Sequence, residues 1–237
     1  MKKKLYIASF IISFCLISGG LAFLYCHNTA KNNSADYTEN LQNKIQKHFY
    51  ANGNLRSETP YKNGIKNGIA KNYYIDGTLK AEISYINGKR SGETVTYYPN
   101  GNKEKIFTYQ NDKLNGPAKA FNDDGLLISE TDFKDNVQYN HEIGYFPNGK
   151  VRYTFDIDDK GIISGKYKEY FENGNLAIET YYVKGKREGL EQEFYETGEL
   201  FRTISYAEDI PNGNVITYHK NGNIISAINY KNGHRAD

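Results

Sequence analysis

The chain has 237 residues, a formal net charge of +2, 38% hydrophobic residues, and 22 tyrosines but no tryptophan. Lys2, Lys3 and Lys4 stand in an N-terminal segment without acidic residues, and elsewhere basic and acidic residues nearly balance, so no basic surface of the kind that binds nucleic acid is expected. No HExxH sequence, nucleophile motif or phosphate-binding glycine loop occurs, which argues against an enzyme.

Residues 1–26 are a leader in which three lysines precede 22 uncharged residues, Leu5 to Cys26. As an α-helix this run would be roughly 33 Å long and could span a bilayer. Because basic residues stay cytoplasmic, an anchor here would place the rest of the chain outside the cytosol, in the periplasm or at the cell surface. A cleaved signal peptide is the alternative, since Gly20-Leu21-Ala22 offers small residues at a cleavage site. The chain is therefore expected to be membrane-anchored through residues 5–26, or secreted.

Residues 27–44 are polar and rich in Asn, Lys, Ala and Ser, and are expected to be a linker. Leu41 and Ile45 stand at helical spacing, but Ile45 and Phe49 also fit the first repeat, which favours a strand there. Both cysteines, Cys15 and Cys26, precede the linker, so the remainder of the chain has no internal disulfide.

Residues 45–237 form an array of about eight repeats with a period of 24 residues and one step of 25. Each repeat has an anchor glycine, here called position 0, with an aromatic residue at position −4. The anchor glycines, expected to be structural, are Gly53, Gly77, Gly101, Gly125, Gly149, Gly174, Gly198 and Gly222. Apolar residues at positions +2, +6 and +8 have even spacing, which is a strand period.

Turn chemistry supports strands. Asn-Gly or a similar pair separates short aromatic and β-branched runs, and only Gly, Asp or Asn occupies a second turn eleven or twelve residues after each anchor. Each repeat is thus predicted to be two strands of about six residues. The expected fold is all-β: an elongated single-layer antiparallel sheet, built as a solenoid of about sixteen hairpin strands and preceded by one N-terminal hydrophobic helix.

The pattern YYxxGxLxxExxYxNGKxxG resembles the MORN-variant repeat, the second type of the membrane occupation and recognition nexus family, over about four fifths of the chain. The turns at Asp112, Asn136 and Asp209 and a residue inserted near Gly161 depart from the pattern. The resemblance implies a scaffold with protein-binding surfaces, and some bacterial members are labelled antitoxins of the YwqK type. Lipid-headgroup binding is also attached to the family name, but no cluster of Lys and Arg supports it here.

The candidate binding surface is formed by the residues at position −3 of successive repeats. Positions −4 and −3 are adjacent in a strand and should point to opposite faces, so if −4 packs inward with +2 and +8, the −3 side chains line the other face. The partner-binding candidates, hereafter the −3 row, are Tyr50, Tyr74, Tyr98, Phe146, Phe171, Tyr195 and His219. Such a row suits protein or glycan contacts, or it simply covers the second side of a thin sheet.

One segment resembles the start of a calcium loop, Asp156-Ile157-Asp158-Asp159-Lys160-Gly161. Lys160 replaces one ligand and Tyr167 stands where the closing glutamate belongs, so a lengthened acidic turn is the simpler interpretation. The five histidines share no metal-ligand spacing, and neither a metal nor another cofactor is expected.

Three functions remain open. The first is a protein-binding scaffold presented outside the cytosol; the second, from the resemblance alone, is an antitoxin or immunity protein whose partner is a toxin. The third is a cell-wall glycan-binding module similar to aromatic choline-binding repeats, although those repeats use tryptophan, which this chain lacks.

Overall fold

The structure is a computed structural model that describes residues 43–236. The strands are β1 (Asn43–Phe49), β2 (Leu55–Lys62), β3 (Ile65–Lys66), β4 (Gly68–Tyr73), β5 (Leu79–Ile86), β6 (Lys89–Tyr97), β7 (Lys103–Gln110), β8 (Lys113–Phe121), β9 (Leu127–Lys134), β10 (Val137–Tyr145), β11 (Val151–Ile157), β12 (Ile163–Tyr170), β13 (Leu176–Val183), β14 (Lys186–Arg187), β15 (Gly189–Phe194), β16 (Leu200–Ala207), β17 (Ile210–Tyr218), β18 (Ile224–Lys231) and β19 (His234–Ala236).

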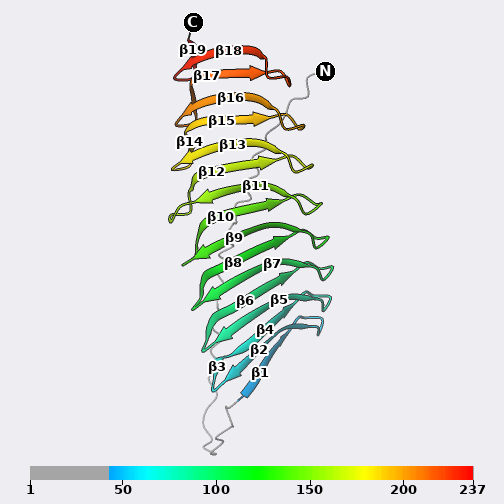
Figure 1. Ribbon diagram of the computed structural model, residues 1–237. Helices are drawn as coiled ribbons and strands as arrows, with labels where there is room; N and C mark the ends of the chain where they lie inside the picture. Colours follow the sequence, from blue (N-terminus) through cyan, green and yellow to red (C-terminus); the bar gives the residue numbers. More distant parts are fainter. Residues whose placement is uncertain (1–42, 237) are drawn as a thin grey trace, which may run out of the picture. The chain divides into compact units, whose positions relative to one another are not determined.

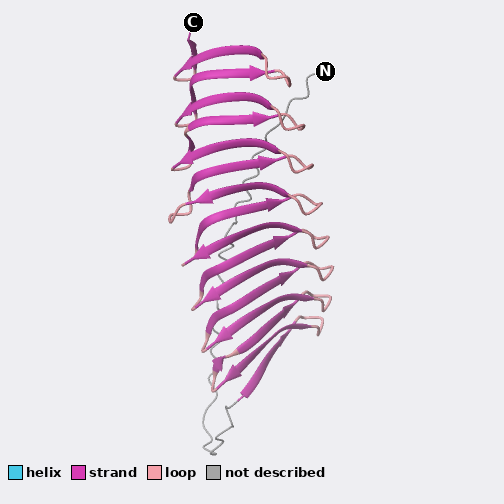
Figure 2. Cartoon of the chain, viewed as in Figure 1, coloured by secondary structure: helices cyan, strands magenta, loops and turns pink. Residues whose placement is uncertain are grey.

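All nineteen strands belong to one antiparallel sheet in which neighbours in sequence are neighbours in space (Figure 1). β2 pairs with both β3 and β4, so β3 and β4 are one strand interrupted at Asn67. In the same way β13 pairs with both β14 and β15, which are one strand interrupted at Glu188. These interruptions and the short β19 raise the count above the predicted sixteen. Figure 2 shows strands and turns and no helix in residues 43–236, which confirms the all-β single-sheet prediction. The expected N-terminal helix lies outside the described residues, whereas Ile45 and Phe49 lie in strand β1, as predicted.

The anchor turns have the predicted chemistry. In the second repeat the N–H of Tyr74 donates to the carbonyl oxygen of Thr78 at 2.8 Å, and the N–H of Gly77 donates to that of Tyr74 at 3.0 Å. The carboxylate of Asp76 accepts the N–H of Thr78 at 2.9 Å. Every anchor glycine has a positive φ, between 80° and 103°, which explains why glycine recurs at this position.

A β-bulge beside each anchor turn decides which residues share a face. Tyr73 pairs with Leu79 while Asn72 pairs with Ala81, so Lys80 is the additional residue. Leu79 therefore shares a face with Tyr73, whereas Ala81 and the +6 and +8 residues point to the opposite face. The expectation that −4 packs with +8 is wrong, because a period-two pattern does not reveal an inserted residue.

We call the face that carries positions −7, −5, +4, +6 and +8 the packed face, because most buried side chains lie there. They are Ala70, Ala81, Thr94, Ala118, Ala120, Ser129, Thr131, Phe133, Glu142, Ile157, Thr180, Glu191 and Ile204. No second layer covers this face in residues 43–236, and most of its buried side chains are small. Leu114, Ala118 and Phe133, with Phe107 and Tyr109 against them, form its hydrophobic centre.

The other face, here the Lys–Glu face, carries positions −6, −4 and +5. Lys71 and Glu82 lie 3.5 Å apart, and equivalent pairs recur along the sheet. The same carboxylate accepts a hydrogen bond from the −4 tyrosine of the next repeat, as Glu82 does from Tyr97 at 2.8 Å. Burial and this bond raise the pKa of Tyr97 to about 12. The pairs are partly exposed and contribute little individually, but they tie each repeat to the next.

The second turns dock onto the preceding repeat. The N–H of Asp112 donates to the carbonyl oxygen of Arg90 at 2.9 Å, and the Asp112 carboxylate accepts the Arg90 N–H at 2.9 Å. Asn136 and Asp209 make the same two bonds to Leu114 and Arg187. These departures from glycine therefore strengthen the stacking of repeats.

Candidate functional site

The −3 row runs along the edge of the sheet formed by the anchor turns. Its tyrosine hydroxyls donate to the carbonyl oxygen of the −4 residue in the next repeat: Tyr50 to Tyr73 and Tyr74 to Tyr97, both at 2.7 Å. Two more bonds have the same form, Tyr98 to Phe121 at 3.0 Å and Tyr195 to Tyr218 at 2.8 Å. These hydroxyls thus join successive repeats, a role that the sequence pattern did not reveal.

The rings of this row are half-buried rather than fully exposed, and only His219 is exposed. In two repeats the bulge residue lies over the −3 ring: the Arg56 guanidinium lies 6.0 Å from the Tyr50 ring centre, and the Lys80 ammonium lies 5.3 Å from that of Tyr74. The structure therefore shows that the −3 row helps to join successive repeats. Its contact with a partner stays a prediction.

Asparagines add further bonds across the same edge. The side-chain amide of Asn54, at position +1, donates to the carbonyl oxygen of Ile75 at 2.8 Å. Asn102 and Asn175 make the equivalent bonds to Asp123 and Glu196. At position −1, Asn100 donates to that same Asp123 carbonyl at 2.6 Å. Successive anchor turns are therefore joined by up to three side-chain bonds.

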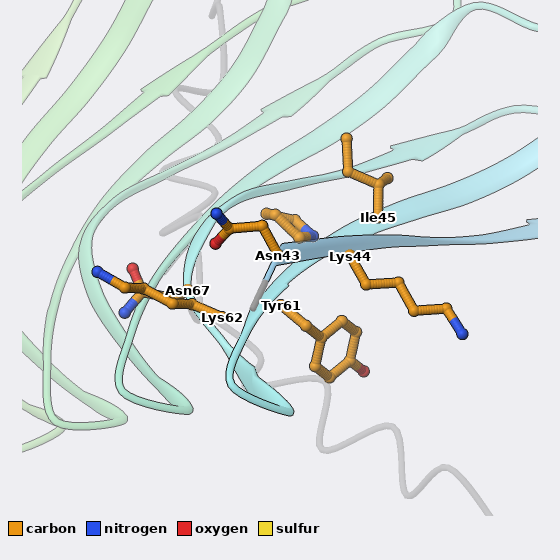
Figure 3. A pocket seen from close by; sticks show the side chains of 7 residues that line it. Asn43, Lys44, Ile45, Tyr61, Lys62 and Asn67 are labelled. Atoms are coloured by element: carbon orange, nitrogen blue, oxygen red, sulfur yellow. The ribbon is translucent and has the colours of Figure 1, made fainter. Parts of the chain in front are cut away.

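A hollow of about 250 Å³ interrupts this edge between the turns of the fourth and fifth repeats. It is lined by Leu126, Leu127, Tyr145, Phe146, Pro147, Asn148 and Gly149. Phe146 is the one −3 residue among them. A larger hollow, about 430 Å³, lies beside β1. Figure 3 shows Lys44 and Tyr61 on one side of that strand and Ile45 on the other; all three residues line the larger hollow.

The packed face carries a chain of ring contacts across three neighbouring strands. Tyr153 stacks on Phe155 with ring centres 5.8 Å apart, Phe155 stacks on Tyr167 at 6.3 Å, and Tyr167 meets Tyr182 edge-on at 5.9 Å. We call these four residues the ring track. Gly144, the cross-strand partner of Tyr153, makes room for it, because a Cβ on Gly144 would lie only 2.2 Å from a carbon of the Tyr153 ring.

Carboxylates accept hydrogen bonds from two hydroxyls of the ring track. Glu142, only 5% exposed, accepts from Tyr153 at 2.8 Å and from the Gln138 amide at 2.6 Å, and Glu169 accepts from Tyr167 at 3.3 Å. Burial, reinforced by these carboxylates, raises the pKa values of Tyr153 and Tyr167 far above the usual range. Within residues 43–236 neither Glu142 nor Glu169 forms an ion pair with Lys or Arg. The repeat pattern in the sequence did not single out this surface, although Tyr153 and Phe155 stand where other repeats have mostly smaller residues.

The acidic segment beginning at Asp156 is built as a turn. The Asp158 carboxylate accepts the N–H groups of Lys160 and Ile162, and that of Asp156 accepts the N–H of Lys166 at 2.9 Å. The described part of the chain holds no group of three or more His, Cys, Asp or Glu side chains arranged to bind a metal ion. Nor does it include a helix of the length and apolar character needed to cross a membrane; residues 1–26 lie outside it.

The comparison with curated proteins finds no match. Solved structures with local similarity include TcdB2-TccC3-TEV, at 14% identity over 74% of this chain and 12% of that chain, with a TM-score of 0.21. A porin-like protein from Bacteroides uniformis is 10% identical over 81% of this chain and 86% of that chain, with a TM-score of 0.23. The Photorhabdus luminescens Tc holotoxin pore is 15% identical over 81% of this chain and 14% of that chain, with a TM-score of 0.22. The chain thus spans about an eighth of the first of these.

The family model described as the MORN repeat variant matches six segments, residues 42–63, 66–87, 90–111, 163–184, 187–208 and 211–232. Together they cover more than half of the sequence and leave residues 112–162 unmatched, where the hollow at Phe146 and the start of the ring track lie. The chain belongs to the MORN repeat variant family.

Proposed function

We propose that this protein is a non-enzymatic scaffold whose repeat sheet binds a protein partner through the ring track. The observation that carries the proposal is the unbroken chain of contacts from Tyr153 to Tyr182 on a face that no other described layer covers. Aromatic side chains are enriched at protein interfaces because they offer large contact areas at a low entropy cost.

The chemistry of the track favours a partner that presents Arg or Lys. Glu142 and Glu169, which form no ion pair within residues 43–236, accept hydrogen bonds from the track hydroxyls, and their negative charge adds to the attraction of the ring faces for a cation. The packed face already uses this contact internally: the Arg90 guanidinium lies 4.2 Å from the ring centre of Tyr109, and that of Arg187 lies 3.9 Å from that of Tyr206.

Adjacent residues of β11 give a matched test. Phe155 lies on the packed face and Thr154 on the Lys–Glu face, so Phe155→Ala removes the centre of the track while Thr154→Ala leaves it in place. A partner would first be identified by cross-linking and mass spectrometry of cells, then measured with purified proteins. We expect Phe155→Ala to weaken its binding at least tenfold and Thr154→Ala to leave it unchanged.

Loss of stability must be separated from loss of the surface. Phe107→Ala removes a ring from the hydrophobic centre of the same face, outside the track, and serves as the control for destabilisation. The proposal fails if Phe155→Ala binds as the unaltered protein does, or if Phe107→Ala weakens binding equally.

We further propose that the leader, residues 1–26, places the scaffold outside the cytosol. Support comes from the three lysines before a membrane-length uncharged run. Protease added to intact cells should remove a tag at the C-terminus while leaving a cytosolic marker untouched. A tag that survives until the cells are lysed would contradict this topology.

A further inference from the structure

The edge formed by the anchor turns has a template that four repeats share. In each, a −3 tyrosine ring spans from its own turn to the next, and its hydroxyl donates to the −4 carbonyl oxygen there. In three repeats the side-chain amide of an Asn at position +1 adds a hydrogen bond to the carbonyl oxygen of residue −2 in the next anchor turn.

The fourth repeat lacks every part of that template. Asn122 replaces the tyrosine, and its side-chain oxygen accepts the N–H of Leu126 in its own turn at 2.8 Å. Leu126 replaces the +1 asparagine, and Asp124 replaces the −1 asparagine with a group that cannot donate when ionised. Among the described residues, no side chain of this turn donates to the fifth repeat's Tyr145 or Pro147 carbonyl oxygen.

The hollow of about 250 Å³ lies where these bonds are missing, with Leu126 and Leu127 on one side and Tyr145, Phe146 and Pro147 on the other. Leu126 is 40% exposed. Elsewhere on this edge the hydroxyl of a −3 tyrosine donates to the −4 carbonyl oxygen of the next repeat, and at this hollow the −4 residue is Tyr145.

We propose that this hollow receives a tyrosine side chain from a basic segment of a protein partner, a proposal that rests on the scaffold function but uses a different surface. The ring takes the place of the absent −3 ring, and its hydroxyl donates to the Tyr145 carbonyl oxygen. Charge complementarity specifies the flanking residues: Asp123 and Asp124 are exposed on the same turn, and neither carboxylate forms an ion pair within residues 43–236. Lys or Arg beside the tyrosine would therefore be favoured.

The test uses the full chain and the peptide N-acetyl-Lys-Tyr-Lys-amide, with binding followed by ligand-observed NMR at millimolar concentrations. Lys-Phe-Lys, which lacks the hydroxyl, is expected to bind several-fold more weakly, and Glu-Tyr-Glu more weakly still. The decisive variant is Asn122→Tyr, which restores the template. It should abolish peptide binding and raise the melting temperature, because the chain's own ring then fills the hollow.

A second variant covers the case in which Asn122→Tyr does not fold. Replacing Asp123 and Asp124 by serine leaves the hollow intact and should reduce Lys-Tyr-Lys binding at least fivefold. Equal binding of the three peptides, or of Lys-Tyr-Lys to Asn122→Tyr, would overturn the proposal. Phe155→Ala should bind the peptide normally, so failure of the ring track and failure of this site are distinguishable.

Discussion

The hydroxyl of Tyr74 donates a hydrogen bond of 2.7 Å to the carbonyl oxygen of Tyr97, 23 residues further along the chain. Tyr74→Phe keeps the ring and removes only this bond, so we expect the free energy of unfolding to fall by about 0.5–1.5 kcal/mol. Tyr74→Ala also removes the ring beneath Lys80 and should cost more. Urea denaturation followed by circular dichroism measures both.

The reciprocal change provides the control. Phe171 occupies the same position in the sixth repeat without a hydroxyl, and Phe194 stands 23 residues later. Phe171→Tyr should therefore stabilise the protein by an amount similar to the loss in Tyr74→Phe. If Tyr74→Phe costs nothing and Phe171→Tyr gains nothing, the hydroxyls are satisfied equally well by water and do not join the repeats.

A second prediction concerns a further glycine that most repeats have fifteen or sixteen residues after the anchor glycine, such as Gly165 and Gly189. Gly165 has φ +125°, and a Cβ there would lie 2.6 Å from the Asp156 carboxylate oxygen, which accepts the N–H of Lys166. Gly189 has φ +84° but open space around it. Gly189→Ala should cost about 1–2 kcal/mol from the left-handed backbone alone. Gly165→Ala should cost about 1–3 kcal/mol more, because overpacking is added.

Thermal unfolding of the two alanine variants separates the two causes. An equal loss of stability in both would show that Asp156 moves aside without cost, and that only the backbone conformation requires glycine at this position.

Much of this fold follows from the sequence because its signals are local. The anchor glycines fix positive φ in every repeat, and the alternation of aromatic and polar residues predicts strands; both were confirmed. The bulge at Lys80 could not be predicted, because the bulged residue is already counted in the 24-residue period and leaves no mark on it. The bulge nevertheless places Tyr73 on the face opposite Tyr85. The ring track was missed for a related reason: its contacts run from Tyr153 through other rings to Tyr182 in the next repeat, and the faces of these residues are set by those bulges.

The second turn of the seventh repeat gives a prediction for acid. The Asp209 carboxylate accepts from the N–H of Arg187 at 3.0 Å and from its guanidinium at 3.1 Å; burial opposes ionisation, but these bonds lower its pKa overall. A carboxyl whose pKa is lower in the folded state stabilises that state above the unfolded pKa, and the contribution is lost as pH falls through the folded pKa. Asp209→Gly keeps the turn conformation used by other repeats and should cost about 1 kcal/mol at pH 7.

The stability difference between the unaltered protein and Asp209→Gly should shrink as the pH is lowered below the ordinary aspartate range. Denaturant titrations at pH 7 and at acid pH measure it. A difference that stays constant with pH would mean that the carboxylate charge does not contribute, and Asp209→Asn, which keeps an acceptor oxygen, would then match the unaltered protein at pH 7.

The Lys–Glu face predicts a loss of stability in alkali. Burial, followed by the bond to Glu82, raises the pKa of Tyr97 from 10.0 to about 12, and Tyr73 is raised to about 12 by burial and its bond to Glu58. A tyrosine whose folded pKa exceeds its unfolded pKa binds its proton more tightly in the folded state. Its stabilising contribution is complete below pH 10 and disappears as the pH rises from 10 to about 12.

Absorbance at 295 nm should therefore show a group of tyrosines that titrates at about 12, above the ordinary tyrosine pKa of about 10. The free energy of unfolding should fall over the same interval, and fall less steeply in Tyr97→Phe, which has no proton to lose. Lysine side chains in general also lose their charge in alkali, so the comparison with Tyr97→Phe isolates the tyrosine contribution from that of ion pairs on this face. Identical slopes in the two proteins would show that Tyr97 ionises without disturbing the contact between repeats.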